Sequence, residues 1–467
     1  MMKIKYWVLP VVLAVTSCRV GRDYARPELN IPGQFRAGVK IDTTMSVLPD
    51  VKDFFKNPTL QALIDTAIVQ NNELKIAIKN IESAQTVLKK VRLNYLPDLN
   101  AQITGNHNIS SANSLAGIGN EQFIGSRSVE DFSASLGLSW EIDIWGRIRR
   151  EKEEALASLL QTQEVKRAVQ TQVVADVANG YYNLLMLDRQ LEIARQSWQL
   201  SDSTLAITNA QYRVGEANGL AIKQAKAQLE LTRQLVPQIE QSIAIQENAL
   251  SLLCGSYAKK ITRQPGESDE FSDVSRAAYA VSLLSTRPDV HAAELGLQVA
   301  NARVGISQAS MYPALTITAT GGLNSFKASN WFSIPGALFG TVAGGLTQPV
   351  FQRRKLNTQY EQAQIEREKA VISFRQSVLQ GYAQVSDALI MNQKLNEQSQ
   401  AAENRQEVLR EGIDAAQILF RTGMVNYLEI ITAENSYLQT RLNVAQLSRE
   451  KAGAIIELYR ALGGGWK

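Results

Sequence analysis

Two long stretches of this chain contain no proline. One runs from Arg147 to about Arg213 with a single glycine at Gly180, and the other runs from Arg353 to about Arg421. Because proline breaks the interior of a helix, each stretch can form one unbroken α-helix of some 66 residues. At about 1.5 Å per residue, such a helix is roughly 100 Å long. The chain must therefore fold around very long helices.

The two stretches belong to an internal repeat. Each ends in nearly the same phrase, "YRVGEAN" at 212–218 and "FRTGMVN" at 420–426, with Gly215 and Gly423 offset by 208 residues. A repeat at a constant offset predicts a tandem duplication, here of about 200 residues. Glycine is favoured where a helix ends in a left-handed residue. We therefore expect two hairpin tips, after which the chain returns as helices at 220–253 and 428–462.

Four segments alternate apolar and small polar residues. Residues 131–142, "DFSASLGLSWEI", alternate strictly, 314–322 do so clearly, and 99–104 and 341–347 do so more weakly. Polar loops rich in Gly and Ser, at about 111–128 and 325–337, separate the strands of each pair. This period is typical of transmembrane barrel strands, although a half-buried soluble sheet gives it too. Known barrels have at least about eight strands, so the four strands of one chain cannot close a barrel. We therefore expect several subunits to share one barrel, with twelve strands from three chains.

The expected fold is mainly α with a small β part, in which a strand pair and a long helical hairpin occur twice. Each half opens with a helix, the first with Asn57 as N-cap and Pro58 at the first helical position. The expected organisation is a lipoprotein signal peptide at 1–17, a lipidated linker at 18–56, a first repeat at 57–255 (strand pair 98–142), an outer belt at 256–285, a second repeat at 286–463 (strand pair 314–350) and a tail at 464–467.

The N-terminus has the form of a secretory signal. Two lysines precede an apolar run that is too short to span a bilayer and that ends in Val15-Thr16-Ser17-Cys18. These four residues resemble a bacterial lipobox, which predicts a lipid on Cys18; the alternative is a plain signal peptide that contains a cysteine. The second cysteine, Cys254, lies in the apolar run "ALSLLCG" and is predicted to be buried. No disulfide is expected.

Composition argues against several classes of function. The net charge of +4 is too weak to indicate nucleic-acid binding. The two histidines, His107 and His291, fit no catalytic, metal-ligand or phosphate-loop spacing. After Val15, no apolar stretch is long enough for a transmembrane helix. We therefore expect no enzyme, no catalytic or metal-binding residue, and no cofactor beyond the lipid on Cys18.

Four motifs resemble the TolC family of outer-membrane efflux ducts, in its lipoprotein branch that serves resistance-nodulation-division pumps. They are "CRVGRDYARPE" after the lipobox, "STRPDVHAAE" at 285–294, the two tip phrases, and "LYRALGGGW" at 458–466. The resemblance implies a homotrimer with a twelve-stranded outer-membrane β-barrel, continued by an α-helical tunnel in the periplasm. It implies passive export of drugs or other toxic compounds, driven by an inner-membrane pump through a periplasmic adaptor. It also implies a lipid-anchored protein of the outer membrane.

The resemblance implies functional residues at the tips. The candidates for adaptor docking are Val214, Gly215, Asn218, Gly423, Val425 and Asn426, and the candidates for the tunnel constriction are Phe420, Arg421, Tyr427 and Glu429. The glycines can also serve only as helix caps. Glu429 either forms a ring of three carboxylates that favours cations or is simply solvated. Phe420 and Ala221 replace a Tyr–Asp latch of some members, so closure would depend on packing of Phe420, Tyr427 and Leu428, or on an Arg421–Glu429 pair.

Three alternatives remain open. A heavy-metal cation duct would have the same fold and differ in its cargo. A periplasmic adaptor would carry one helical hairpin instead of two, and a structural coiled-coil lipoprotein would lack the period-two segments.

Overall fold

The computed structural model describes the whole chain except residues 1–19, 30–31, 33, 37–47, 264–286 and 467. The described residues form two compact units. Unit 1 comprises Met1–Pro27, Glu82–Leu160 and Leu295–Ile372, and unit 2 comprises Glu28–Ile81, Gln161–Glu294 and Ser373–Lys467. Each sequence repeat contributes to both units, so the units do not coincide with the repeats.

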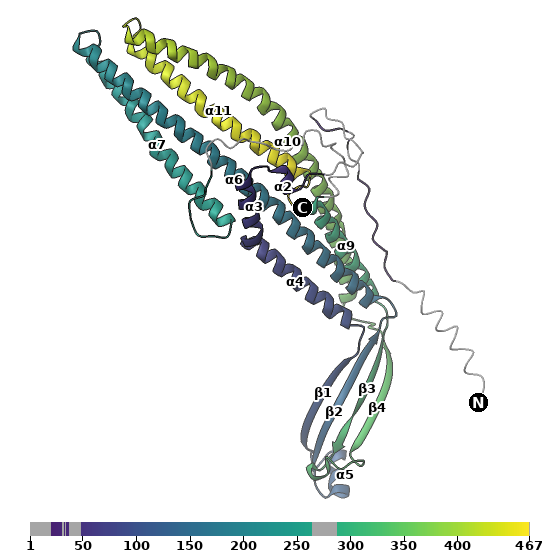
Figure 1. Cartoon of the computed structure of the whole chain (residues 1–467). Coiled ribbons are helices and arrows are strands. Elements are labelled where there is room, and N and C mark those ends of the chain that lie inside the picture. Colours follow the sequence, from purple (N-terminus) through teal and green to yellow (C-terminus); the bar gives the residue numbers. More distant parts are fainter. Residues whose placement is uncertain (1–19, 30–31, 33, 37–47, 264–286, 467) are drawn as a thin grey trace. The chain divides into compact units, whose positions relative to one another are not determined.

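Unit 1 contains one antiparallel sheet in the order β1-β2-β3-β4 (Figure 1). Its strands are β1 Asp98–Ile109, β2 Ser128–Ile142, β3 Ala314–Ser325 and β4 Leu338–Thr347. The register places Leu99, Leu138, Ala319 and Val342 in one row across the sheet. The next row holds Asn100, Gly137, Thr320 and Thr341. Because successive side chains point to opposite faces, one face of the sheet is apolar and the other is polar.

The segment between β1 and β2 corrects one prediction. The expected loop at 111–128 contains the helix α5, Leu115–Ile124. The Ser114 side chain accepts a hydrogen bond from Gly117 N, and Gly125 ends the helix in the left-handed conformation. The expected loop at 325–337 holds a single 3₁₀ turn, η1 Ala328–Asn330.

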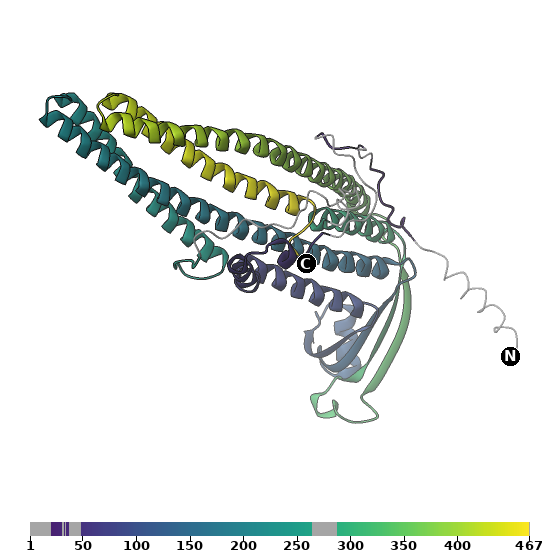
Figure 2. The ribbon, with the colours of Figure 1, turned by 45° about the horizontal axis from the view of Figure 1, so that its top comes forward.

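Two helical hairpins, each of whose first helix begins in unit 1, make up most of unit 2 (Figure 2). The first consists of α6 Arg147–Arg213 and α7 Gly219–Leu253, and the second of α10 Lys355–Arg421 and α11 Tyr427–Ala461. The helices α6 and α10 each have 67 residues, and α7 and α11 each have 35. These equal lengths confirm the predicted duplication. The helix α10 begins two residues later than expected, because Arg353 and Arg354 have positive φ angles.

Shorter helices pack against the hairpins of unit 2. They are α2 Val51–Phe54, α3 Pro58–Gln70, the first part of α4 Asn72–Leu93, and the first part of α9 Pro288–Ala309. The core that α2, α3 and α4 share with α6, α7, α10 and α11 includes the fully buried Phe54, Tyr181 and Leu250. Cys254 is buried in this core, as predicted.

The first helix of the repeat differs from its prediction at one residue. The Asn57 cap is confirmed, since its side chain accepts from Leu60 N. The expected continuous helix is interrupted at Asn71, whose Oδ1 accepts from Leu74 N and whose Nδ2 donates to Leu253 O. Asn71 therefore caps α4 and also ties it to the end of α7.

Two of the sequence motifs are partners in the fold of unit 2. Arg287 of "RPD" is buried and donates from Nη1 to Ala461 O at 2.7 Å, within "LYRALGGGW". Its other amino group donates to Asp289 and to Gln384. The pKa of Asp289 is lowered by this arginine despite the opposing effect of burial. The two motifs together hold the end of α11.

Among the residues that the structure describes, no helix is long and apolar enough to cross a membrane. The predicted signal peptide at 1–17, Cys18 and most of the predicted belt at 256–285 lie outside the described residues.

Candidate functional site: the paired hairpin tips

The two hairpin tips have the same backbone hydrogen bonds. In the first tip, Gly215 N donates to Tyr212 O at 3.1 Å and Glu216 N donates to Gln211 O at 2.9 Å. In the second, Gly423 N donates to Phe420 O and Met424 N donates to Leu419 O. This pair of bonds defines the Schellman motif, which requires a left-handed residue after the helix. Gly215 and Gly423 have φ angles of 85° and 73° and supply it.

An asparagine begins the returning helix in each tip. The side chain of Asn218 accepts a hydrogen bond from Ala221 N at 2.9 Å. The side chain of Asn426 accepts from Leu428 N at 2.9 Å and from Glu429 N at 3.3 Å. The repeated Gly and Asn therefore have a structural role as caps. Together they make each tip a short, well-defined turn.

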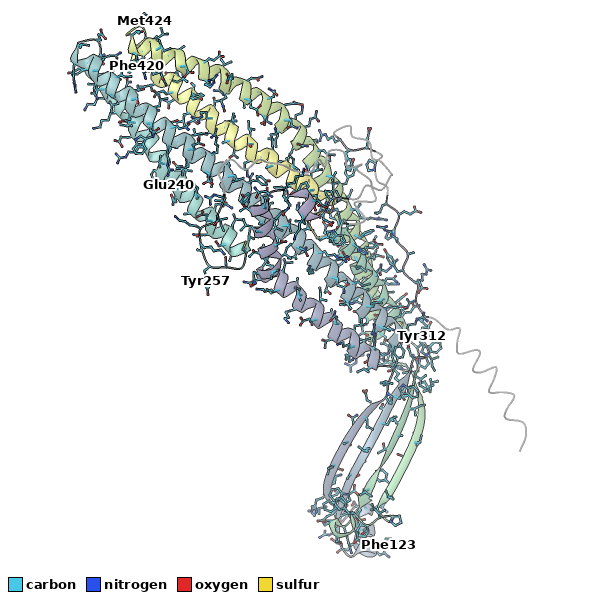
Figure 3. All side chains as sticks on the ribbon, viewed as in Figure 1. Phe123, Glu240, Tyr257, Tyr312, Phe420 and Met424 are labelled. Atoms are coloured by element: carbon cyan, nitrogen blue, oxygen red, sulfur yellow. The ribbon has the colours of Figure 1, made fainter. Side chains whose placement is uncertain are left out.

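Apolar side chains are exposed on both turns. Val214 is 72% exposed and Met424 is 73% exposed, and Leu220 and Leu428, which are related by the 208-residue offset, are both exposed. Figure 3 shows Met424 at the end of the second hairpin. Apolar groups gathered on an exposed surface are typical of sites of protein contact. The predicted docking residues Val214, Gly215, Asn218, Gly423 and Asn426 are exposed here, whereas Val425 is half-buried.

Sequence analysis missed Met424, Leu220 and Leu428 as members of this surface. Their signal was available: each is a large apolar residue within two residues of a capping asparagine, where most neighbours are polar or small.

Phe420 is not at the surface. Its side chain is 1% exposed and packs with Ile413 and Ile430 against Leu200 and Ile207 of α6. Tyr427 and Val425 are partly buried against the same cluster. In addition, Gln211 Nε2 donates to Phe420 O at 2.8 Å. The Phe420 ring therefore joins the two hairpins just inside their tips, and its place in a tunnel constriction stays a prediction.

The exposed charges of the second tip are not paired with each other. Glu429 lies in the first turn of α11 and accepts from Asn426 Nδ2 at 3.4 Å. Arg421 is exposed at the last residue of α10. Within the described part of the chain, the Arg421–Glu429 pair proposed as a latch does not form.

A buried carboxylate lies farther inside the hairpins. Glu434 is 5% exposed, its Oε1 accepts from Thr204 Oγ1 of α6, and its Oε2 has no hydrogen-bond partner. Burial raises the pKa of Glu434, and the nearby hydroxyl groups of Thr204 and Ser201 oppose that rise. Beside it, the amide groups of Gln228 and Asn435 bond to each other at 2.7 and 3.1 Å. Sequence analysis missed Glu434, although it occupies the apolar spacing between Ile430 and Leu438.

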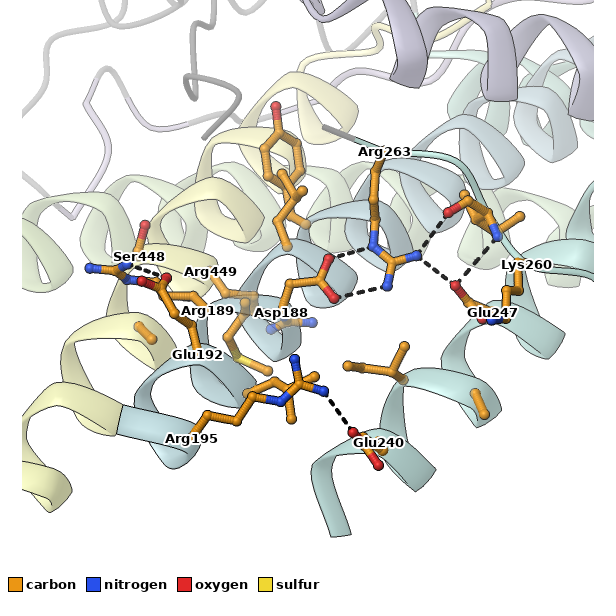
Figure 4. Close-up of a pocket in the computed structure, with 18 of the residues that line it drawn as sticks. Asp188, Arg189, Glu192, Arg195, Glu240, Glu247, Lys260, Arg263, Ser448 and Arg449 are labelled. Carbon is orange, nitrogen blue, oxygen red and sulfur yellow. Dashed lines mark hydrogen bonds and ion pairs between the residues drawn. The ribbon is translucent and has the colours of Figure 1, made fainter. Parts of the chain in front are cut away.

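An open groove of about 1300 Å³ lies along the hairpins in unit 2. It is lined by α6, α7, α11 and residues 260–263 (Figure 4). Arg263 bridges two helices there, donating to Asp188 of α6 at 2.9 Å and to Glu247 of α7 at 2.6 Å. The hydrogen bonds that Arg263 donates to Asp188 raise the pKa of this arginine, so its guanidinium stays charged. Its ion pairs fasten the first residues of the predicted belt to the first hairpin.

These features define a class: a duplicated protein whose strand pairs present one apolar face and whose helical hairpins end in exposed, rigid tips. The model of the outer membrane efflux protein family matches residues 63–256 and 280–464. The chain therefore belongs to the outer membrane efflux protein family, and it is an outer-membrane channel component of an efflux system.

Individual relatives match nearly the whole chain. The cation efflux system protein CusC of Escherichia coli O6:H1 is 30% identical over 461 residues, which cover 98% of each chain. The solvent efflux pump outer membrane protein SrpC of Pseudomonas putida is 27% identical and covers 100% of this chain and 99% of its own. A crystal structure of CusC has a TM-score of 0.86 and 28% identity, covering 96% of this chain and all of its own. The predicted fold class, family and outer-membrane location are confirmed.

Proposed function

We propose that three copies of this chain assemble into one passive export duct. Each copy supplies four strands, and twelve strands close a sheet whose apolar face, including the row Leu99–Leu138–Ala319–Val342, contacts lipid. The crystal structure of CusC supports this assembly through its similarity over 96% of the chain. The duct performs no catalysis, and its one attached group is a lipid on Cys18.

The observation that carries the proposed mechanism is the pair of rigid, exposed tips. A periplasmic adaptor would dock its own helices on them, and an inner-membrane resistance-nodulation-division pump would supply the energy. Because the Schellman turns and asparagine caps fix the backbone, the exposed side chains at Val214, Leu220, Met424 and Leu428 are held in place for a partner. Rigid presentation lowers the entropy cost of binding.

This docking is tested by substitution at the tips. In a bacterium that lacks its own duct, Met424→Asp should abolish resistance and adaptor crosslinking while outer-membrane trimers form at the normal level. The matched control is Thr422→Asp, an exposed neighbour that presents no apolar group. Normal resistance and crosslinking with both Met424→Asp and Leu428→Asp would contradict tip docking.

For the cargo, we propose small toxic organic compounds, as the name of the solvent-efflux relative SrpC suggests. The second candidate is a metal cation, which the name of the cation-efflux relative CusC favours. Growth of a duct-deficient strain that expresses this chain together with an adaptor and pump, challenged with toluene or with heavy-metal cations, separates the two. Protection against the metals alone would overturn the first proposal.

Glu429 offers a test of the proposed ring of carboxylates. Three exposed carboxylates around one opening attract cations, and the first tip has Ala221 at the corresponding position. Glu429→Ala should therefore lower the cation preference of single channels in planar bilayers. Glu216→Ala, in the first tip, is the control. Unchanged selectivity in Glu429→Ala channels would rule out the ring.

A further inference from the structure

The start of the described chain is bound by side chains far along the sequence. Within unit 1, Arg150 of α6 donates from Nη2 to Gly21 O and from Nη1 to Asp23 Oδ1, both at 3.1 Å. Asn301 of α9 donates from Nδ2 to Arg22 O, also at 3.1 Å. Arg367 of α10 holds that amide by donating to its Oδ1 at 3.0 Å. Three consecutive residues are thus each held by a defined partner.

Two glycines allow this close approach. Gly21 has a φ of 91°, and a Cβ there would lie 3.0 Å from the Cα of Gly305. A Cβ on Gly305 would in turn lie 3.0 Å from Cδ and Nε of Arg150. Any side chain at either position would therefore separate the segment from α9 or displace the guanidinium. The surface formed by α9 and Arg150 therefore requires a glycine at position 21 of the segment.

The burial and charge pairing of Arg150 also indicate that the segment covers this side chain. The Arg150 side chain is only 4% exposed and is paired with Asp23 and with Glu153, the latter at 2.7 Å. Removing one partner of a buried charge is strongly unfavourable. The segment "GRD" covers this arginine and supplies two of its acceptors, so its binding stabilises a group that α6 alone would leave partly unpaired.

The site lies close to the end of the sheet from which α6 begins. Arg150 lies in the first turn of α6, directly after β2 ends at Ile142. At the same end of the sheet, the rings of Trp145 and Tyr312 stack with their centroids 4.9 Å apart, and Trp140 Nε1 donates to Tyr95 O. Tryptophan and tyrosine are enriched where a membrane protein meets the interface. Arg150, which binds the segment, therefore follows five residues after Trp145 at this aromatic end of the sheet.

We propose that Arg150, Asn301 and Gly305 form a docking site for the chain's own segment Gly21–Asp23, which sets where the lipid on Cys18 enters the membrane. The role in lipid placement rests on the proposed function, in which Cys18 is acylated. Two residues separate Gly21 from Cys18, so the Cα of Cys18 can lie at most about 11 Å from that of Gly21. The site thereby ties the lipid anchor to the interfacial end of the same chain's strands.

Trypsin tests the docking directly, because the bond after Arg22 is protected only while the segment is bound. In folded full-length protein in detergent, Arg150→Met and Gly21→Ala should each accelerate cleavage after Arg22 at least tenfold, as measured by mass spectrometry. Arg149→Met is the matched control: that neighbour is exposed and, like Arg150, pairs with Glu153, whereas the hydrogen bonds to the segment come from Arg150. Equal acceleration in Arg149→Met, or none in Gly21→Ala, would overturn the proposal. Gly21→Ala also decides the question if Arg150→Met fails to fold, since Gly21 lies outside every helix and strand.

A second measurement addresses the lipid. Spin labels at Val20→Cys and at the exposed Lys152→Cys, in acylated protein with Cys254→Ser, should give one narrow distance that broadens in Gly21→Ala. A broad distribution already in the parent protein would contradict a fixed anchor. Protection from trypsin should persist in Cys18→Ser, because docking of the segment does not require the lipid. The docking site and the proposed function of the duct are therefore tested independently of each other.

Discussion

At the scale of single residues, two carboxylates five positions apart have opposite environments. Glu429 is exposed at the start of α11, whereas Glu434 is buried between α11 and α6 with one oxygen unpartnered. The first can act on ions in solvent. The second can only affect how the hairpins hold together, because its charge is isolated from water.

The buried carboxylate makes stability depend on pH. Since burial raises the pKa of Glu434 in the folded chain, the folded state binds the proton more tightly than the unfolded state, and stability falls as pH rises from about 4.5 through the folded pKa. Glu434→Gln should therefore raise the free energy of unfolding at pH 8 by about 1 kcal/mol or more. The gain should vanish below pH 4.5. Denaturant melts across this range measure it, with Glu429→Gln as control; a gain that is independent of pH would contradict the explanation.

At the scale of elements, the hairpins depend on a few positions where backbone and packing are tightly constrained. Gly423 ends α10 in the left-handed conformation, whereas Gly412 lies inside the same helix with open space around its Cα. Phe420, between these two, is the buried contact to the first hairpin.

The two glycines should respond oppositely to alanine. Gly412→Ala should stabilise the hairpin by about 0.5–1 kcal/mol, because alanine favours a helix interior. Gly423→Ala should destabilise it by about 1 kcal/mol, because alanine strains the left-handed turn. Thermal melts of the purified protein give both signs. The same sign for both substitutions would contradict the assigned turn.

Loss of the Phe420 ring should loosen the tips. Phe420→Ala removes a fully buried aromatic group, a change that typically costs about 3–5 kcal/mol. Amide hydrogen exchange should accelerate at 413–430 and in the facing part of α6. Leu419→Ala, at an exposed neighbour, should leave exchange near the parent rate. Equal exchange in both variants would show that the cluster does not join the hairpins.

The elements were predictable where one local signal dominates. The proline-free stretch between the strand that ends at Ile142 and the turn at Gly215 predicted α6, and strict alternation predicted β2 and β3. Errors arose where a short signal competed with composition. Ser114 and Gly125 cap α5, but Gly117 and Gly119 between them favour a loop. Asn71 interrupts the first helix because its side chain reaches Leu253, a contact 182 residues away that no local pattern contains.

The residues of the hairpin tips were also predictable only in part. Their glycines and asparagines were identified because capping needs specific residue types. The burial of Phe420 could not be predicted, because it depends on the neighbouring hairpin, which begins some 200 residues earlier.

At the scale of the whole molecule, the sheet has two chemically different faces. Neighbouring positions on β4 illustrate this: Val342 shares a row with Leu99, Leu138 and Ala319, and Thr341 shares one with polar or small residues. In the proposed trimer, the first row would face lipid and the second would face the duct.

An arginine at each position should distinguish the faces. Val342→Arg should destabilise the membrane-inserted trimer, with a cost of about 2–4 kcal/mol for a charge near the middle of the bilayer. Thr341→Arg should leave assembly intact and change conductance. Trimer yield on unheated gels and single-channel recordings measure the two effects. Normal assembly of Val342→Arg together with failure of Thr341→Arg would reverse the assigned faces.

The repeated turn has a consequence for partner stoichiometry. Each chain presents two tips with one backbone but different side chains, since Glu216 corresponds to Met424 and Ala221 to Glu429. In the proposed trimer, six turns would be quasi-equivalent in shape and would alternate between two chemistries. Six identical partner subunits around this ring would each have to bind two chemically different tips with the same residues. Three partner subunits could each bind one kind of tip.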